Sequence, residues 1–301
     1  MPAAAQPSWW RLELDPPAEL EESLLWCLDS LGVHRAAVRF RPELPHQRVL
    51  QAWLPEIDWP EQERQALTEA LAQMGEPFGL SLPPVRWQLQ PEEDWALSWK
   101  RHWQPDPVGE RLLILPAWLK APDEYSDRLA VLIDPGSAFG TGSHPTTRLC
   151  LEALEKRSLG GLRVVDLGCG SGILGIASLV LGAAQVLASD TDGLAVRATA
   201  ENAALNRAGS ALQVQLGSAD VLRQMLAGAP ADLLFCNILA PVLTDMTPAF
   251  SQLLTSSGEG LLSGLLIDQA PALTAHLHAH GWKVTAEAEQ GRWSLLAIQR
   301  D

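Results

Sequence analysis

An aspartate and three alternating glycines, Asp166, Gly168, Gly170 and Gly172, separate two apolar runs of this 301-residue chain. The valine-rich run before the aspartate predicts a buried strand, and residues 173–181 predict a helix. Glycines in such a turn allow the backbone to approach a ligand closely, because no Cβ stands in the way. The first turn of the helix then offers unpaired N–H groups to that ligand. The stretch therefore predicts a cofactor site between a strand and a helix.

Two kinds of cofactor fit this glycine turn. Residues 170–175 match G-x-G-x-x-G, the dinucleotide fingerprint. The wider pattern Asp-x-Gly-x-Gly-x-Gly, starting at Asp166, resembles the motif of S-adenosylmethionine-dependent methyltransferases. In those enzymes the acid faces the end of the cofactor that carries an ammonium and a sulfonium. A carboxylate in that place would oppose the pyrophosphate of a dinucleotide. The stretch thus favours a methyltransferase over a dehydrogenase, and either over a purely structural turn.

Two further polar residues end predicted strands. Asp190 ends the strand 185–190 and lies 18 residues past Gly172, where an acid can accept both ribose hydroxyls of NAD or of S-adenosylmethionine. Asn237 ends the strand 232–237. Amino-directed methyltransferases place Asn, Asp or Ser there, often before Pro-Pro, and Ile-Leu in this chain departs from that form. We expect the residues after Asn237 to form an apolar wall, and the alternative is that Asn237 only caps the next helix.

A loop of glycine and small polar residues, DPGSAFGTGSHPTT at 134–147, precedes the strand of the glycine turn. Such a loop can wrap a ligand, although an ordinary long loop is the alternative. Helical periodicity resumes at Arg148, so Ser143 or the threonines can cap that helix. His144 is the nearest candidate for a general base, but its place beside Pro145 at a helix start favours a structural role.

The order of the surrounding elements predicts two domains. Residues 1–90 show the order β-α-β-β-α-β, which matches the ferredoxin-like unit. Residues 91–110 form a connector, with a helix that carries Trp95, Trp99 and Trp103 and then two prolines. Strands and helices alternate over 111–301, which predicts a doubly wound parallel sheet. The last two strands, near 282–288 and 293–299, have no helix between them and predict an antiparallel hairpin.

Composition limits the functional classes. The chain is 47% hydrophobic and 19% charged, as expected of a packed globular protein. We find no secretory signal and no apolar run that would span a bilayer, and the four scattered cysteines suggest neither zinc nor disulfides. The net charge of −14 argues against a nucleic-acid-coating surface. Residues 1–95 carry −9 of that charge, which serves either solubility or the docking of a basic partner.

Three stretches together, residues 134–147, 166–174 and 237–240, resemble the ribosomal protein L11 methyltransferase (PrmA) family. The resemblance covers nearly the whole chain, including the tryptophan-bearing connector. It implies an α/β fold with a Rossmann-like, seven-stranded class I methyltransferase domain, preceded by a small α+β ferredoxin-like domain that docks the substrate protein. It also implies S-adenosylmethionine as cofactor and ribosomal protein L11 as substrate. We expect a cytoplasmic monomer with no metal, no membrane contact and no direct contact with nucleic acid.

The family resemblance also assigns residues. Thr147, Gly168, Asp190 and Asn237 match its cofactor-contacting positions. From their place in the motifs we add four more cofactor-binding candidates, namely Phe139, Asp166, Gly170 and Gly172. Asn237 is in addition the candidate catalytic residue, since its carbonyl could orient the lone pair of an amine.

The expected acceptor is a lysine side chain or an N-terminal amine. A protonated amine has no lone pair, and neutralising it at pH 7 costs roughly 4.6 kcal/mol for lysine and about 1.4 kcal/mol for an α-amine. No dedicated base is apparent, so we expect positioning to supply most of the rate. Three alternatives remain: another amino-directed methyltransferase acting on a different protein, a nucleobase or a small molecule; a non-catalytic acidic adaptor; and a nicotinamide oxidoreductase.

Overall fold

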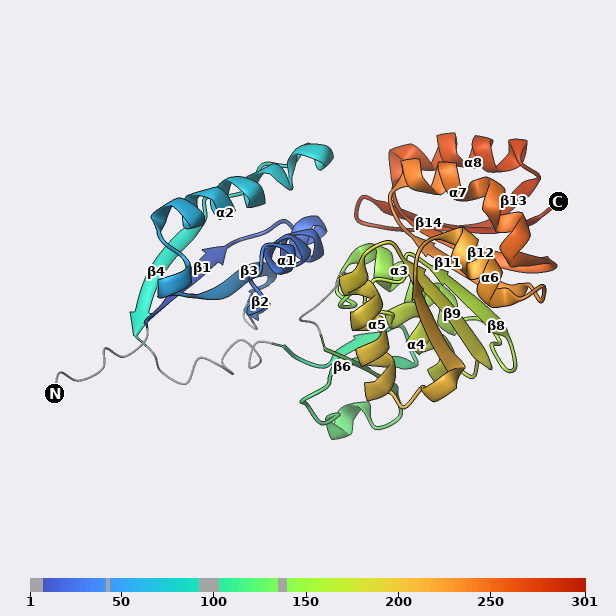
Figure 1. Cartoon of the computed structure of the whole chain (residues 1–301), viewed down its shortest axis with the longest axis horizontal. Coiled ribbons are helices and arrows are strands. Elements are labelled where there is room, and N and C mark those ends of the chain that lie inside the picture. The colour runs from blue at the N-terminus through green and yellow to red at the C-terminus, as the bar shows by residue number, and fades with distance from the viewer. Residues whose placement is uncertain (1–7, 42–43, 92–102, 135–139) are drawn as a thin grey trace. The chain divides into compact units, whose positions relative to one another are not determined.

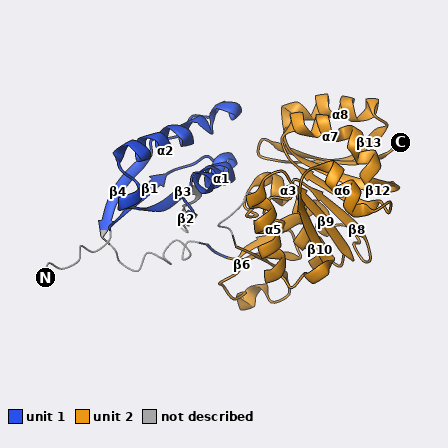
Figure 2. Cartoon of the chain, in the orientation of Figure 1, with its two compact units in different colours: residues 1–104 blue, residues 105–301 orange. Residues whose placement is uncertain are grey.

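The computed structural model describes residues 8–41, 44–91, 103–134 and 140–301 (Figure 1). The chain divides into two compact units, residues 1–104 and residues 105–301 (Figure 2). Trp95 and Trp99, on the predicted connector helix, lie outside the described residues, as does Phe139.

In its described residues, the first unit is a four-stranded antiparallel sheet with two α-helices and three short 3-10 helices. Its elements are β1 (Ser8–Leu14), η1 (Ala18–Leu20), α1 (Glu21–Ser30), β2 (Ala36–Arg41), β3 (Leu44–Pro55), η2 (Glu56–Asp58), α2 (Glu61–Gln73), η3 (Glu76–Phe78) and β4 (Arg86–Pro91). The strands lie in the order β2-β3-β1-β4, and each neighbouring pair is antiparallel. Both the order along the chain and the order in the sheet are those of the ferredoxin-like unit.

Alternation along β1 explains the core of this unit. Leu12 and Leu14 point to the helical side, where they pack with apolar residues of both helices, such as Leu24 of α1 and Leu67 of α2. Trp9, Arg11 and Glu13 occupy the other face of the strand because side chains alternate. The first unit therefore has a hydrophobic core of its own.

The second unit contains a seven-stranded and a three-stranded sheet. Its strands are β5 (Asp106–Val108), β6 (Leu112–Pro116), β7 (Leu129–Ile133), β8 (Arg163–Leu167), β9 (Gln185–Asp190), β10 (Leu212–Leu216), β11 (Ala231–Asn237), β12 (Leu254–Leu266), β13 (Trp282–Gln290) and β14 (Trp293–Arg300). Its helices are η6 (Asp123–Tyr125), α3 (Pro145–Glu155), α4 (Ile173–Val180), α5 (Gly193–Leu205), η7 (Gly209–Ala211), α6 (Ala219–Leu226), α7 (Ala240–Leu253), η8 (Ile267–Gln269) and α8 (Ala270–Ala279).

The large sheet has the order β10-β9-β8-β11-β12-β14-β13. The first five strands are parallel, and β14 is antiparallel to both β12 and β13. The predicted terminal hairpin and the Rossmann-like sheet are thus confirmed. In the small sheet, β6 lies between antiparallel β5 and parallel β7.

Helices cover both faces of the large sheet. Helices α6, α7 and α8 share one hydrophobic core with the sheet (Figure 1). Helix α4 packs against both α3 and α5, and all three also contact strands of the sheet. The parallel strands β8, β9 and β11 are neighbours or next neighbours, so their carboxyl ends meet at one edge. That edge is where open α/β sheets bind ligands. Within the described residues, no helix is long and apolar enough to cross a membrane.

Candidate active site

The glycine turn joins β8 to α4, as the sequence predicts. Gly168 has a φ of +78°, and a Cβ there would lie 2.6 Å from Cγ2 of Ile238. Gly172 precedes the first residue of α4 with a φ of +80°, and its Cβ would lie 2.8 Å from Cγ2 of Thr199. Both positions need glycine, for the left-handed backbone and for the close approach of neighbours. The turn therefore lies tightly against the segment after β11 and against α5.

Asp190 reaches this turn from the end of β9. Its Oδ2 accepts the N–H of Gly170 at 3.0 Å, and its Oδ1 accepts the N–H of Asp192 at 3.0 Å. Each carboxylate oxygen can accept more than one hydrogen bond. Asp190 is half-buried, so it keeps acceptor capacity for a ligand beside the turn.

Three other residues of the predicted site carry buried oxygens that have no hydrogen-bond partner among the described residues. They are Thr147 Oγ1, Asp166 Oδ1 and Asn237 Oδ1. Buried polar atoms in folded proteins are almost always paired, and an unpaired one calls for an explanation. A ligand rich in hydrogen-bond donors would supply the missing partners.

Asp166 is the most strongly perturbed of these residues. It is 1% exposed, and only its Oδ2 has a partner, the N–H of Gly175 at 3.2 Å. Burial raises the pKa of this carboxyl from 3.8 to about 7, with the bond from Gly175 acting against the rise and the charge of Asp190 adding to it. A cationic ligand would favour the ionised form.

His144 is the N-cap of α3. Its Nδ1 accepts the N–H of Thr146 at 3.3 Å, and its ring packs edge-on against Trp293 with centroids 4.9 Å apart. The prediction that Ser143 or the threonines cap this helix is therefore wrong, because the helix begins at Pro145, three residues before the predicted start at Arg148, and His144 is the residue before it. His144 has the structural place that its position beside proline indicated.

Asn237 does not cap α7. The N-cap residue of that helix is Leu239, and the helix has no capping hydrogen bond from a side chain. The alternative that Asn237 caps the helix is therefore wrong. The expected apolar wall is only partly present, because Ala240 is buried and Ile238 half-buried while Leu239 is 57% exposed. The backbone here is fixed by the N–H of Ile238, which donates to the carbonyl of Ser263 at 3.1 Å.

Two buried polar residues at the glycine turn, Ser171 and Asn202, are absent from the predicted set of site residues. Ser171 lies within the turn, and Asn202 of α5 donates to the carbonyl of Ser171 at 2.9 Å. The one signal in the sequence that could have identified Asn202 is the presence of a polar residue on the buried face of a predicted helix. Phe139 lies outside the described residues.

The cysteines and the possible metal ligands are further candidate reactive groups. All four cysteines are free and buried, and burial raises the pKa of the Cys169 thiol, which lies in the turn, and that of Cys236. Buried thiols of this kind are poor nucleophiles. Among the described residues, no group of three or more His, Cys, Asp or Glu side chains could hold a metal ion.

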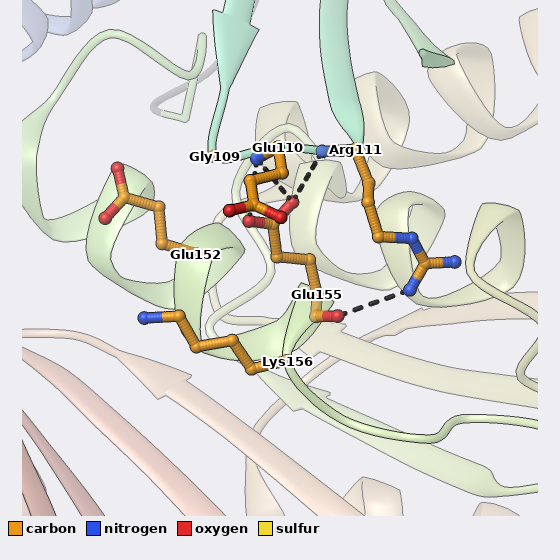
Figure 3. A pocket seen from close by; sticks show the side chains of 6 residues that line it. All are labelled: Gly109, Glu110, Arg111, Glu152, Glu155 and Lys156. Atoms are coloured by element: carbon orange, nitrogen blue, oxygen red, sulfur yellow. Dashed lines mark hydrogen bonds between the residues drawn. The ribbon is translucent and has the colours of Figure 1, made fainter. Parts of the chain in front are cut away.

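A cavity of about 350 Å³ lies at the opposite end of α3 (Figure 3). It is lined by Gly109, Glu110, Arg111, Glu152, Glu155 and Lys156. Figure 3 shows the carboxylate of Glu155 turned toward the backbone of the β5–β6 turn, where it accepts the N–H groups of Glu110 and Arg111 at 2.9 Å each. An eleven-residue helix spans about 16 Å, so this cavity lies well away from the start of α3, where His144 caps the helix. The role of Glu155 is to fasten the β5–β6 turn.

Known proteins resemble the chain over its whole length. The sequence model of the family described as "Ribosomal protein L11 methyltransferase (PrmA)" matches residues 8–301. The ribosomal protein L11 methyltransferase of Synechococcus sp. (strain RCC307) is 84% identical over 100% of both chains. Its counterpart in Parasynechococcus marenigrum (strain WH8102) is 59% identical over 94% of this chain and 99% of that one. The crystal structure of a ribosomal protein L11 methylase from Lactobacillus delbrueckii subsp. bulgaricus superposes with a TM-score of 0.59 at 33% identity, covering 66% of this chain and 99% of that one.

Proposed function

This chain belongs to the ribosomal protein L11 methyltransferase (PrmA) family, and from that membership we propose that it transfers methyl groups from S-adenosylmethionine to amino groups of ribosomal protein L11. The acceptors are lysine side chains, the N-terminal amine, or both. The observation that carries the proposal is the set of unpaired buried oxygens around the glycine turn.

These oxygens suit S-adenosylmethionine in kind. The cofactor bears an ammonium, two ribose hydroxyls and an adenine amine, all of which donate hydrogen bonds. Asp166 Oδ1 and Thr147 Oγ1 are acceptors of the required type, and Asp190 has acceptor capacity left at the end of β9. A carboxylate that binds a cation makes a charge-assisted bond, roughly twice as strong as a neutral one. Asp166 and Asp190 therefore contribute most of the polar binding energy.

Bound S-adenosylmethionine supplies a methyl group that its sulfonium makes electrophilic. The chain has to present a neutral amine to that group and hold its lone pair in line. Asn237 Oδ1 accepts an amine N–H and so orients the nitrogen. Leu239, exposed beside it, offers an apolar surface to the incoming side chain and favours the neutral amine. Positioning of this kind can lower a barrier by several kcal/mol.

The first unit captures the substrate protein. It has its own core, and residues 1–95 carry a net charge of −9. Glu61, Glu63 and Glu69 are exposed on α2, and complementary charge speeds the encounter with a lysine-rich protein. Recognition of the substrate is thus assigned to the ferredoxin-like elements between β1 and β4. We place the enzyme in the cytoplasm with its substrate.

Mass spectrometry of the large ribosomal subunit from cells lacking this protein tests the proposal. L11 should lose its methyl groups, and the wild-type chain should restore them while a chain with Asn237→Ala restores few. Unchanged methylation of L11, together with a loss of methyl groups from another component, would show that the enzyme acts on a different amine.

A further inference from the structure

Ser171 is held on two sides within the glycine turn. Its hydroxyl donates to the carbonyl oxygen of Gly140, and its own carbonyl accepts a hydrogen bond from Nδ2 of Asn202 at 2.9 Å. Ser171 is 2% exposed and Asn202 is 1% exposed, so both bonds are shielded from water. Hydrogen bonds in such surroundings are electrostatically stronger than at the surface.

Asn202 extends this connection to a second point of the chain. Its Oδ1 accepts the N–H of Asp134 at 2.8 Å, so one planar amide joins Asp134 to Ser171. Asp134 follows directly after β7, and Gly140 is the next residue that the structure describes. Ser171 is thus tied to both residues, directly to Gly140 and through Asn202 to Asp134.

The contact at Gly140 leaves no room for a side chain. Gly140 has a φ of +101°, and a Cβ there would lie 2.8 Å from Oγ of Ser171. The serine hydroxyl would have to give up its bond to the carbonyl of residue 140. A glycine at this position is what allows the backbone to reach Ser171.

Two further polar residues, Thr199 within α5 and Asn206 at its C-cap, bond to neighbouring backbone but differ from Asn202 in their partners. Thr199, three residues earlier, donates to the carbonyl of Gly170 at 2.9 Å. Asn206, four residues later, bonds to both backbone groups of Leu132, at 2.8 Å and 2.6 Å. Among these three residues, only Asn202 bonds both to the glycine turn and to the chain after β7.

We propose that Ser171 and Asn202 are positioning residues for the cofactor. They hold Asp134 and Gly140 against the glycine turn, so that residues 140–147 and the turn itself present their groups to one ligand. Neither residue has to touch the cofactor, because the effect is to order the surrounding backbone before binding. The inference rests on the proposed function, since it takes S-adenosylmethionine as the ligand.

The test compares cofactor binding in three variants by calorimetry. Asn202→Ala and Ser171→Ala should each weaken S-adenosylmethionine binding by about tenfold, the effect of losing one or two buried hydrogen bonds. Turnover at saturating cofactor should stay near that of the wild type, so that KM for the cofactor rises while kcat does not fall. Asn206→Ala is the matched control: Asn206 is the C-cap residue of the same helix, and its variant loses three hydrogen bonds, none of them to the turn, so it should bind within about twofold of wild type.

The melting temperature of each variant shows whether weaker cofactor binding comes from a general loss of stability. If Asn202→Ala does not fold, Asn202→Asp keeps the acceptor for Asp134 while removing the donor to Ser171, and it should bind as weakly as Ser171→Ala. Wild-type affinity in the Asn202 and Ser171 variants, or an equal loss in Asn206→Ala, would overturn the positioning role. If the wild-type chain itself bound no S-adenosylmethionine, the proposed function would fail instead, so the two failures are distinguishable.

Discussion

Asn237 holds a buried oxygen that lacks a partner among the described residues, where β11 ends and α7 has not yet begun. If this oxygen orients the amine, Asn237→Ala should lower turnover at saturating cofactor by about tenfold or more, as expected for a lost buried hydrogen bond, and leave cofactor affinity near normal. Steady-state kinetics and calorimetry on the one variant measure both quantities. A turnover that recovers fully at saturation would show instead that Asn237 only contacts the cofactor.

For Asp190 we expect the opposite result, a weaker cofactor affinity with an unchanged turnover at saturation, so its variant serves as the comparison for Asn237→Ala. Its carboxylate lies at the end of β9, where it faces the turn rather than the amine. Asp190→Ala should weaken S-adenosylmethionine binding by roughly tenfold or more, because charge-assisted bonds contribute about 1.5–3 kcal/mol. Saturating cofactor should restore its turnover. Unchanged affinity in this variant would remove Asp190 from the cofactor site.

Asp166 links cofactor binding to pH. Its pKa in the folded protein is about 7, against 3.8 for the ordinary side chain. Between these values the folded chain binds a proton that the unfolded chain has released, so the contribution of Asp166 to stability is complete below pH 4 and is lost as pH rises through 7. The loss is of the order of a few kcal/mol.

Asp166→Asn removes that dependence, since an amide does not titrate. Without cofactor, the difference in melting temperature between variant and wild type should grow in favour of the variant from pH 4 to pH 8. Glu21 of the first unit also has a pKa raised to about 7 by burial, so the comparison with wild type is needed to isolate Asp166. A difference that stays constant with pH would contradict the raised pKa. The variant should also bind S-adenosylmethionine more weakly at pH 8, where wild-type Asp166 is ionised.

At the level of the elements, His144 at the start of α3 could be a helix cap or a general base, and its variants distinguish the two roles. His144 caps this helix through Nδ1 and lies edge-on to Trp293. His144→Ala should cost about 1 kcal/mol or more through the lost cap, and His144→Asn, which retains a capping acceptor, should recover part of it. Both variants should keep their turnover, whereas removal of a general base costs about a hundredfold or more. Melting curves and initial rates together decide between the two roles.

Buried elements with strong local signals were predictable from the sequence. Strand 185–190 has the predicted bounds, and the glycine turn between β8 and α4 is in its expected place. β12 is long, from Leu254 to Leu266, because its pairing with β11 and β14 continues over polar residues. Tertiary pairing of that kind leaves no mark on local composition.

Among the site residues, too, some were predictable from local sequence and others depend on contacts between distant parts of the chain. Asp166 lies near the end of β8 and Asp190 ends β9, as the apolar runs of the sequence predict, and their contacts with the cofactor stay predictions. Asn202 could not be found, because its partners are backbone groups of Asp134 and Ser171, which are distant along the chain. His144 as a cap was missed because histidine is not among the preferred N-cap residues.

At the level of the whole molecule, the two compact units predict separable functions. A truncated chain that starts at Asp106 should still bind S-adenosylmethionine, yet it should methylate L11 slowly because the acidic first unit is gone. Raising the ionic strength should raise KM for L11 in the full chain, since exposed charges are screened over about 8 Å at 0.15 M salt. The truncated chain should show little such dependence. Equal rates for the two chains at low salt would contradict the capture role.

The transfer itself is the most direct measurement. Purified chain, purified L11 from cells lacking the enzyme and S-adenosylmethionine with a labelled methyl group are mixed, and the label on L11 is located by peptide mass spectrometry. The proposed function predicts label on lysine or N-terminal amines, and little label when Asn237→Ala replaces the wild-type chain or when the amines of L11 are chemically blocked. Absence of label from L11, with a wild-type chain that binds the cofactor normally, would contradict it.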